Sequence, residues 1–244
     1  MSVRFRLPAA VAALTLSLGL VAAPAPVASA AQDCSSTDQY YVNNHRISAW
    51  SERFNGWQCR TWDNSASWLW INLGQNSGAY DAGIGKNTGG KRVDSQAVGI
   101  GTYVKMTVNV SGSGHYWAGP KTIISSTQNY SGLVGENECY IVDKAKWSPQ
   151  DLANWANLTY RGQGTYDGSV YKHYTVNYQG INQIWSIRQN YRSEGWTSVG
   201  YILRDWRRLG LCANNYNLGW KMNVETNGQV NGEIGFSHLS LPWN

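Results

Sequence analysis

The alternation of apolar and polar residues from Val98 to Val110 constrains the fold most strongly. One parity of this segment is apolar: Val98, Ile100, Val104, Met106, Val108 and Val110. Lys105, Thr107 and Asn109 occupy the other parity. Successive side chains of a strand point to opposite faces of a sheet, so the segment predicts a long strand with one buried face. Further short strand patterns, separated by Gly, Asn, Asp and Ser, fill most of the chain and indicate an all-β protein.

One helix is predicted among these strands, at about residues 198–210. Its apolar residues recur at helical spacing: Val199, Ile202, Leu203, Trp206 and Leu209. Ser198 is a candidate N-cap, and Gly210 stands where a C-terminal left-handed glycine belongs. Many strands and one α-helix predict a β-jelly-roll sandwich of two antiparallel sheets, with a closed barrel as the alternative.

The first 30 residues have the organisation of a secretory signal peptide. Two arginines precede an apolar run at residues 9–23, and Ala28-Ser29-Ala30 resembles a cleavage site. The alternative, a transmembrane anchor, is disfavoured by two prolines that follow the run, and no later segment approaches 18 apolar residues. We therefore expect a secreted, extracellular protein with one domain at residues 31–244. We expect it to be a monomer that binds no membrane.

The composition favours a polar partner that stacks on aromatic rings. The chain has 13 Trp and 15 Tyr residues, but only 14% of its residues are charged. Aromatic faces stack on sugar rings while amides and hydroxyls bond their rims, although β-sheet proteins are in general rich in aromatics. The net charge of +5 is too weak and too scattered to indicate nucleic acid.

Four cysteines in an exported chain suggest disulfides. Cys34 and Cys59 flank the first strand pattern and are the preferred pair, closing a loop of about 25 residues worth about 3 kcal/mol. Cys139 either pairs with Cys212 or is a buried free thiol. Because the sequence has no Cys-x-x-Cys or paired-His spacing, we expect no metal and no cofactor.

Two glutamates are candidates for paired acid–base chemistry. Glu138 lies in a predicted strand at residues 136–143, on the same face as Glu136 and opposite an apolar face. Glu225 shares its parity with Lys221 and Asn223. Two facing carboxylates are what glycoside hydrolysis requires. The pattern alone leaves open whether they face each other.

Six segments, in order and at similar spacing, resemble the family 11 glycoside hydrolases, which are single-domain endo-β-1,4-xylanases with a β-jelly roll. The segments are Glu138-Cys139-Tyr140-Ile141-Val142, Trp147-Ser148-Pro149, residues 167–175, residues 184–189, the helix ending in Leu209-Gly210-Leu211, and Val224-Glu225 followed by Gly228, Gln229 and Gly232. The resemblance extends from Asn76 to the C-terminus. It implies a retaining mechanism with Glu138 as nucleophile and Glu225 as general acid/base.

The same resemblance implies the substrate-binding residues Asn76, Tyr140, Gln183 and Tyr130, and we add Trp50 from the first third of the chain. Asn76 matches the position that contacts the acid/base, where an Asn goes with a less acidic pH optimum. Tyr140 and Gln183 match cleft residues, and Tyr130 and Trp50 would supply stacking. Tyr130 lies eight residues before Glu138, whereas the family's stacking Tyr lies nine before its nucleophile.

The chain also departs from the family 11 pattern. The long thumb hairpin over the cleft is missing or reduced to a short turn between Thr175 and Ile184. The first third, from Asp33-Cys34 to Cys59, resembles instead family 12, the thumbless endo-β-1,4-glucanases and xyloglucanases. The expected partner is therefore a polysaccharide, with xylan as first choice. The alternatives are β-1,4-glucan or xyloglucan as substrate, or a non-catalytic sugar-binding lectin on the same scaffold.

Overall fold

The computed structural model describes residues 30–34, 37–42, 44–93, 100–127, 136–212 and 216–240, without the side chains of residues 52–55, 75–77, 87–89 and 91. The predicted signal peptide up to residue 29, Val98, Tyr130 and the side chain of Asn76 lie outside this description. No helix in the described part of the chain is long and apolar enough to cross a membrane.

Strands dominate the chain, as the alternating patterns predict. The elements are β1 (Ala30–Asp33), β2 (Asp38–Val42), β3 (His45–Asp63), β4 (Leu69–Arg92), β5 (Thr102–Ser111), β6 (His115–Ser125), β7 (Asn137–Val142), β8 (Lys144–Ala145), α1 (Pro149–Trp155), β9 (Thr159–Tyr166), β10 (Ser169–Tyr178), β11 (Ile181–Arg188), β12 (Glu194–Thr197), α2 (Val199–Arg208), β13 (Tyr216–Asn227) and β14 (Asn231–Ser240).

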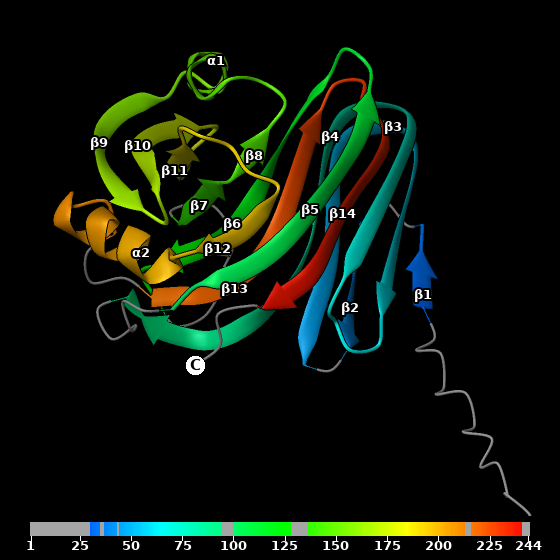
Figure 1. Ribbon diagram of the computed structural model, residues 1–244, viewed down its shortest axis with the longest axis horizontal. Coiled ribbons are helices and arrows are strands. Elements are labelled where there is room, and N and C mark those ends of the chain that lie inside the picture. The colour runs from blue at the N-terminus through cyan, green and yellow to red at the C-terminus, as the bar shows by residue number, and fades with distance from the viewer. Residues whose placement is uncertain are drawn as a thin grey trace, which may run out of the picture.

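The long strand β4 joins the two layers of the sandwich. Residues 69–73 of β4 pair with β14, whereas residues 79–92 pair with β13. The first layer runs β12-β5-β14-β4, and the second runs β4-β13-β6-β7-β11-β10-β9. Figure 1 shows β5 and β14 on one side of the molecule and β7, β9, β10 and β11 curling round on the other. The predicted jelly-roll sandwich is therefore confirmed, with its hydrogen bonding continuous through the bent strand.

Two features refine the predicted architecture. Among the described pairs, β11 and β7 run parallel rather than antiparallel. The connection between them is long and contains β8, α1, β9 and β10. A second helix, α1, accompanies the predicted α2. It has only seven residues, too few for a recognisable apolar stripe, and it begins with Pro149 behind the N-cap Ser148.

Helix α2 begins and ends almost where the sequence predicts. Gly210 has a φ of 72°, and its N–H donates to the Arg207 carbonyl, as expected of a left-handed cap. Ser198, however, does not cap the helix with its side chain. Its hydroxyl instead donates to Asp167 Oδ1 at 2.7 Å, which ties the start of α2 to the β9–β10 turn.

Each layer buries the apolar parity of its strands. Between the layers lie, among others, Ile47, Leu69, Ile71, Ile84, Val104, Met106, Met222, Ile234 and Phe236. A second cluster forms where Ile202, Leu203 and Trp206 of α2 pack with Cys139 and Ile141 of β7. Since β7 buries this parity, Glu138 and Tyr140 point to the opposite face of the sheet.

The predicted reduction of the thumb is confirmed. Strands β10 and β11 are joined by Gln179-Gly180 alone, with Tyr178 directly across from Ile181. Gln179 and Gly180 have φ values of 51° and 83°, which is the geometry of a two-residue type I′ hairpin turn. Nothing between these strands is long enough to reach over the sheet.

The preferred pair Cys34–Cys59 is confirmed, and Cys139 is the buried free thiol of the second alternative. Cys34 and Cys59 form a disulfide across 25 residues of sequence. Cys139 and Cys212 are both free thiols, buried in the cluster beneath α2.

We predict that the Cys34→Ser/Cys59→Ser double variant loses about 3 kcal/mol of unfolding free energy, because its unfolded chain is no longer constrained. Urea unfolding followed by circular dichroism measures the loss. Reductant should destabilise the wild type by a similar amount and leave the variant unchanged. An equal response of both proteins to reductant would contradict the assignment.

Candidate active site

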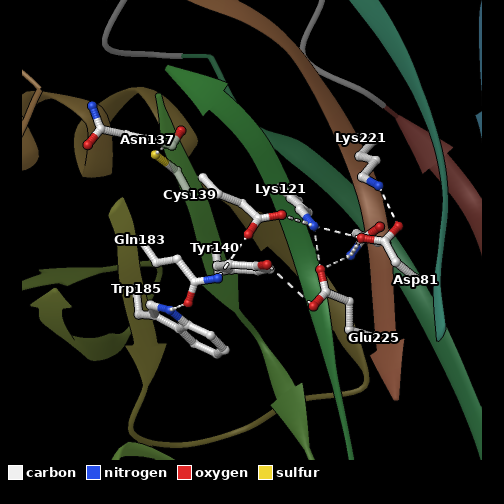
Figure 2. A network of polar contacts seen from close by, with 11 residues as sticks. Asp81, Lys121, Asn137, Cys139, Tyr140, Gln183, Trp185, Lys221 and Glu225 are labelled. Carbon is white, nitrogen blue, oxygen red and sulfur yellow. Dashed lines mark hydrogen bonds and ion pairs between the residues drawn. The ribbon is translucent and has the colours of Figure 1, made fainter. Parts of the chain in front are cut away.

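The site lies on the face of the second layer that is turned away from α2. It is formed by five neighbouring strands in the order β4, β13, β6, β7 and β11. Figure 2 shows Lys121, Asp81 and Glu225 pointing toward one another from three of these strands, with Tyr140 beside them. The register explains the meeting, because Glu225 stands across from Asp81 on β4 and from Trp117 on β6.

A single ammonium group joins the two candidate glutamates. Lys121 Nζ lies 2.6 Å from Glu138 Oε1 and 2.6 Å from Asp81 Oδ2, and it also contacts Glu225 Oε1. When two carboxylates contact the same nitrogen, the two contacting oxygen atoms are at most two hydrogen-bond lengths apart, or about 5–6 Å. The structure therefore brings Glu138 and Glu225 into one site.

Glu138 is held as an ionised carboxylate. Its second oxygen accepts a hydrogen bond of 2.9 Å from Gln183 Nε2, and Trp185 Nε1 donates to Gln183 Oε1 at 3.1 Å. The indole thus orients the amide so that its N–H₂ faces Glu138. Burial would raise the pKa of Glu138, but the charge and hydrogen bond of Lys121 and a hydrogen bond from Tyr140 lower it below its usual value.

Glu225 is held in the opposite protonation state. Burial, with the negative charges of Asp81 and Glu138, raises the pKa of Glu225 to about 8 against the opposing charge of Lys121. The Tyr140 hydroxyl lies 3.3 Å from Glu225 Oε2. Two neighbouring carboxyls with pKa values pushed apart are suited to act as acid and base.

Asp81 is a third carboxylate that the sequence prediction missed. It lies between two lysines, with Lys221 Nζ 2.5 Å from its Oδ1 and Lys121 Nζ 2.6 Å from its Oδ2. Burial would raise the pKa of Asp81, but the two ammonium groups hold it far below its usual value. Asp81 stands across from Glu225, five places further along β4 than Asn76, whose predicted contact with the acid/base stays a prediction.

A sequence signal for Asp81 and the lysines was present but weak. Tyr80, Ala82 and Ile84 are buried in the core, so Asp81 belongs to the parity of β4 that faces the site. On β13, Lys221 shares the parity of Glu225. A side chain at Gly85 would overlap with the Trp220 carbonyl oxygen and with Cα and Cβ of Lys221, so this glycine lets β13 approach closely at the lysine.

Of the other residues considered in the sequence analysis, Tyr140 lies inside the site, Trp50 at its rim and Glu136 outside it. Tyr140 is buried in the site and stacks on Trp185 with ring centroids 4.4 Å apart. Trp50 lies across from Asp81 on β3 and is 50% exposed, at the rim. Glu136 is not in the site, since its carboxylate accepts a 2.7 Å hydrogen bond from the Ser125 hydroxyl.

Aromatic rings extend the site on the side of Tyr140 and Trp185. Trp117, the cross-strand neighbour of Glu225, lies 5.4 Å from Trp185 and 5.7 Å from Trp155 between ring centroids. Trp117, Tyr140 and Trp185 are buried against one another, and Trp155 is exposed, so of these rings Trp155 has a face on which a sugar could stack. Among the residues described, no group of three or more His, Cys, Asp and Glu side chains is arranged to hold a metal ion.

Comparisons with solved structures define the class of fold. The family 11 xylanase from Neocallimastix patriciarum superposes with a TM-score of 0.71 at 19% identity, covering 87% of this chain and 98% of that chain. A mutant of ENZbleach xylanase superposes with a TM-score of 0.69 at 17% identity, covering 87% and 86%. The chain therefore has the β-jelly-roll fold of family 11 xylanases.

Sequence comparisons lead to two relatives. Endo-1,4-beta-xylanase 2 of Rhizopus oryzae is 28% identical over 192 residues, which are 75% of this chain and 77% of that protein. Endo-1,4-beta-xylanase A of Piromyces sp is 36% identical over 83 residues, which are 33% of this chain but only 13% of that protein. No family profile matches the chain. The resemblance of the first third to family 12 stays a prediction.

We predict that one carboxyl group titrates near pH 8 in the carbon-13 NMR spectrum of glutamate-labelled protein and is absent from Glu225→Gln. In Asp81→Asn this titration should move to lower pH, because a negative neighbour that opposes the ionisation of Glu225 is lost. Asp151→Asn, on the exposed surface of α1, is the matched control and should leave it in place. A wild-type spectrum without a carboxyl titrating above pH 6 would refute the assignment.

Proposed function

We propose that this protein is a secreted endo-β-1,4-xylanase that cleaves with retention, with Glu138 as nucleophile and Glu225 as general acid/base. The observation that carries the proposal is the pairing of an ionised and a protonated glutamate on one ammonium group. Retaining glycosidases use two carboxyl groups about 5–5.5 Å apart, which is compatible with this bridge.

Each glutamate has the protonation state that the first step requires. Glu138 attacks the anomeric carbon and forms a covalent glycosyl–enzyme, while Glu225 gives its proton to the leaving oxygen. Glu138 then carries no charge, so one cause of the raised pKa of Glu225 disappears. Glu225 can then accept a proton from the water that releases the sugar.

Xylan is the preferred substrate because both sequence relatives are named endo-1,4-beta-xylanases. Trp50, Tyr140 and Gln183 are the proposed substrate contacts, with Trp50 at the rim and the other two beside Glu138. Asn76 and Tyr130 stay proposals from the resemblance. The two-residue turn between β10 and β11 does not reach over the sheet. No thumb hairpin therefore prevents a branched polysaccharide from binding there.

Secretion is supported by two independent features. The N-terminal residues have the pattern of a signal peptide. The Cys34–Cys59 disulfide is of the kind that persists in oxidising compartments.

We predict that the wild type releases reducing sugar fastest from xylan in a side-by-side assay with carboxymethylcellulose and xyloglucan. Glu138→Gln should abolish hydrolysis but keep substrate binding. In Glu225→Gln the rate of hydrolysis should fall by about 10²–10⁴-fold, because only the proton transfer is removed. Glu136→Gln, directly before the same strand but outside the site, is the control. Binding without any cleavage by the wild type would favour a lectin instead, and faster cleavage of a glucan would reassign the substrate.

We predict that kcat/KM for xylan falls on the alkaline side near pH 8, because Glu225 loses the proton that the leaving group needs as pH rises through its pKa. On the acid side, activity should persist below the usual range of a glutamate, because the pKa of Glu138 is lowered and its carboxylate stays ionised. Asp81→Asn should move the alkaline limb to lower pH. An activity optimum above pH 9 would contradict Glu225 as the acid.

A further inference from the structure

Lys121 occupies the centre of the site, although two-carboxylate hydrolysis requires no lysine. Strand β6 runs between β13 and β7, and Lys121 stands across from Lys221 on one side and from Tyr140 on the other. Its side chain is 8% exposed. Its ammonium group also lies 4.7 Å from the centre of the Tyr140 ring.

The charges of the site balance only when Lys121 is present. Three carboxyls, Asp81, Glu138 and Glu225, face two ammonium groups, Lys121 and Lys221. One bound proton then makes these five side chains neutral together. Burial and the charges of Asp81 and Glu138 place this proton on Glu225. Without Lys121, neutrality needs a second proton. Asp81 would still be paired with Lys221, so the second proton would fall on Glu138 and remove the nucleophile.

We propose that Lys121 is a positioning residue for hydrolysis: its ammonium is the shared counter-ion that fixes Glu138 beside Glu225 and keeps Glu138 ionised next to Asp81. This inference rests on the proposed function. The geometry supports it because Lys121 alone among the described side chains contacts all three carboxylates.

The ammonium does not block the attack of Glu138. Lys121 contacts Oε1 and Gln183 contacts Oε2, but each carboxylate oxygen has two lone-pair sites. With the hydrogen bond from Tyr140, three of the four lone-pair sites are used and one remains open. The two side chains thus hold the carboxylate in one orientation and leave it able to form a bond.

Lys221 is the natural comparison for Lys121. The two lysines are neighbours on adjacent strands, yet the ion pair of Lys221 is with Asp81, away from Glu138. Among the described residues, Tyr140 on β7 is a further titratable group facing the site, and Arg46 of β3, across from Gly85, lies on the same parity as Trp50, one strand beyond Asp81. From β11 comes the neutral Gln183.

The test is the pH profile of kcat/KM in three variants. In Lys121→Met, the acid limb should move up by about 1–3 pH units, because an adjacent opposite charge lowers a carboxyl pKa by that amount. Lys121→Arg keeps the charge and should restore most of the limb. Lys221→Met should shift the acid limb by less than Lys121→Met does.

A purely structural role for Lys121 would lower activity at every pH without moving the limb. An acid limb of Lys121→Met that coincides with the wild type, or a shift in Lys221→Met that is as large, would overturn the proposal.

A second measurement does not depend on turnover. The carbon-13 carboxyl signal of Glu138, assigned by its absence from Glu138→Gln, should titrate at higher pH in Lys121→Met than in wild type. If this shift appears but no polysaccharide is cleaved, the proposed function fails and the counter-ion role stands. If the titration of Glu138 is unchanged in active enzyme, only the role of Lys121 fails.

Should Lys121→Met not fold, Lys121→Arg provides the test. A Glu138 signal that titrates at the wild-type pH in Lys121→Arg supports the charge requirement, and a displaced titration contradicts it.

Discussion

The packing of α2 against one face of β7 determines where the nucleophile candidate of the site points. Trp206, Ile202 and Leu203 take up the face that carries Cys139 and Ile141. Because a strand alternates its side chains, Glu138 and Tyr140 must then face the other way. A shift of one residue in this strand would bury the carboxylate under the helix and expose the thiol, so the apolar cluster and the polar site are two outcomes of one register.

Alternation of apolar and polar residues predicted the strands, and apolar residues at helical spacing predicted α2. Both signals are short-range. The jelly roll followed from the combination of many strands with one helix. The pairing of β7 with β11 could not be predicted, since its register depends on the intervening helix and hairpin rather than on either strand. Lys121 and Asp81 were missed for the same reason, and so was the ion pair of Lys221, which had been placed only on the face of Glu225. Their residue types are unremarkable, and their importance arises only when three strands bring them together.

Asp81 shows how a site on a sheet depends on strand pairing. The pairing of β4 with β13 places Asp81 across from Glu225, while Asn76, further back on β4, stays a prediction. A third carboxylate would change the proton balance of a site that contained only two glutamates. Here the two lysines compensate for the added negative charge, so the five groups form one electrostatic unit.

The turn at Gln179-Gly180 has a consequence for the way binding energy is used. A two-residue type I′ turn holds its two strands in a fixed hairpin and provides no hinge. An enzyme with a movable lid can use part of its substrate affinity to close that lid and can be delayed by its reopening. A two-residue hairpin has neither step at β10–β11. At this place on the sheet, discrimination between substrates therefore depends on side chains that are in position before the substrate arrives.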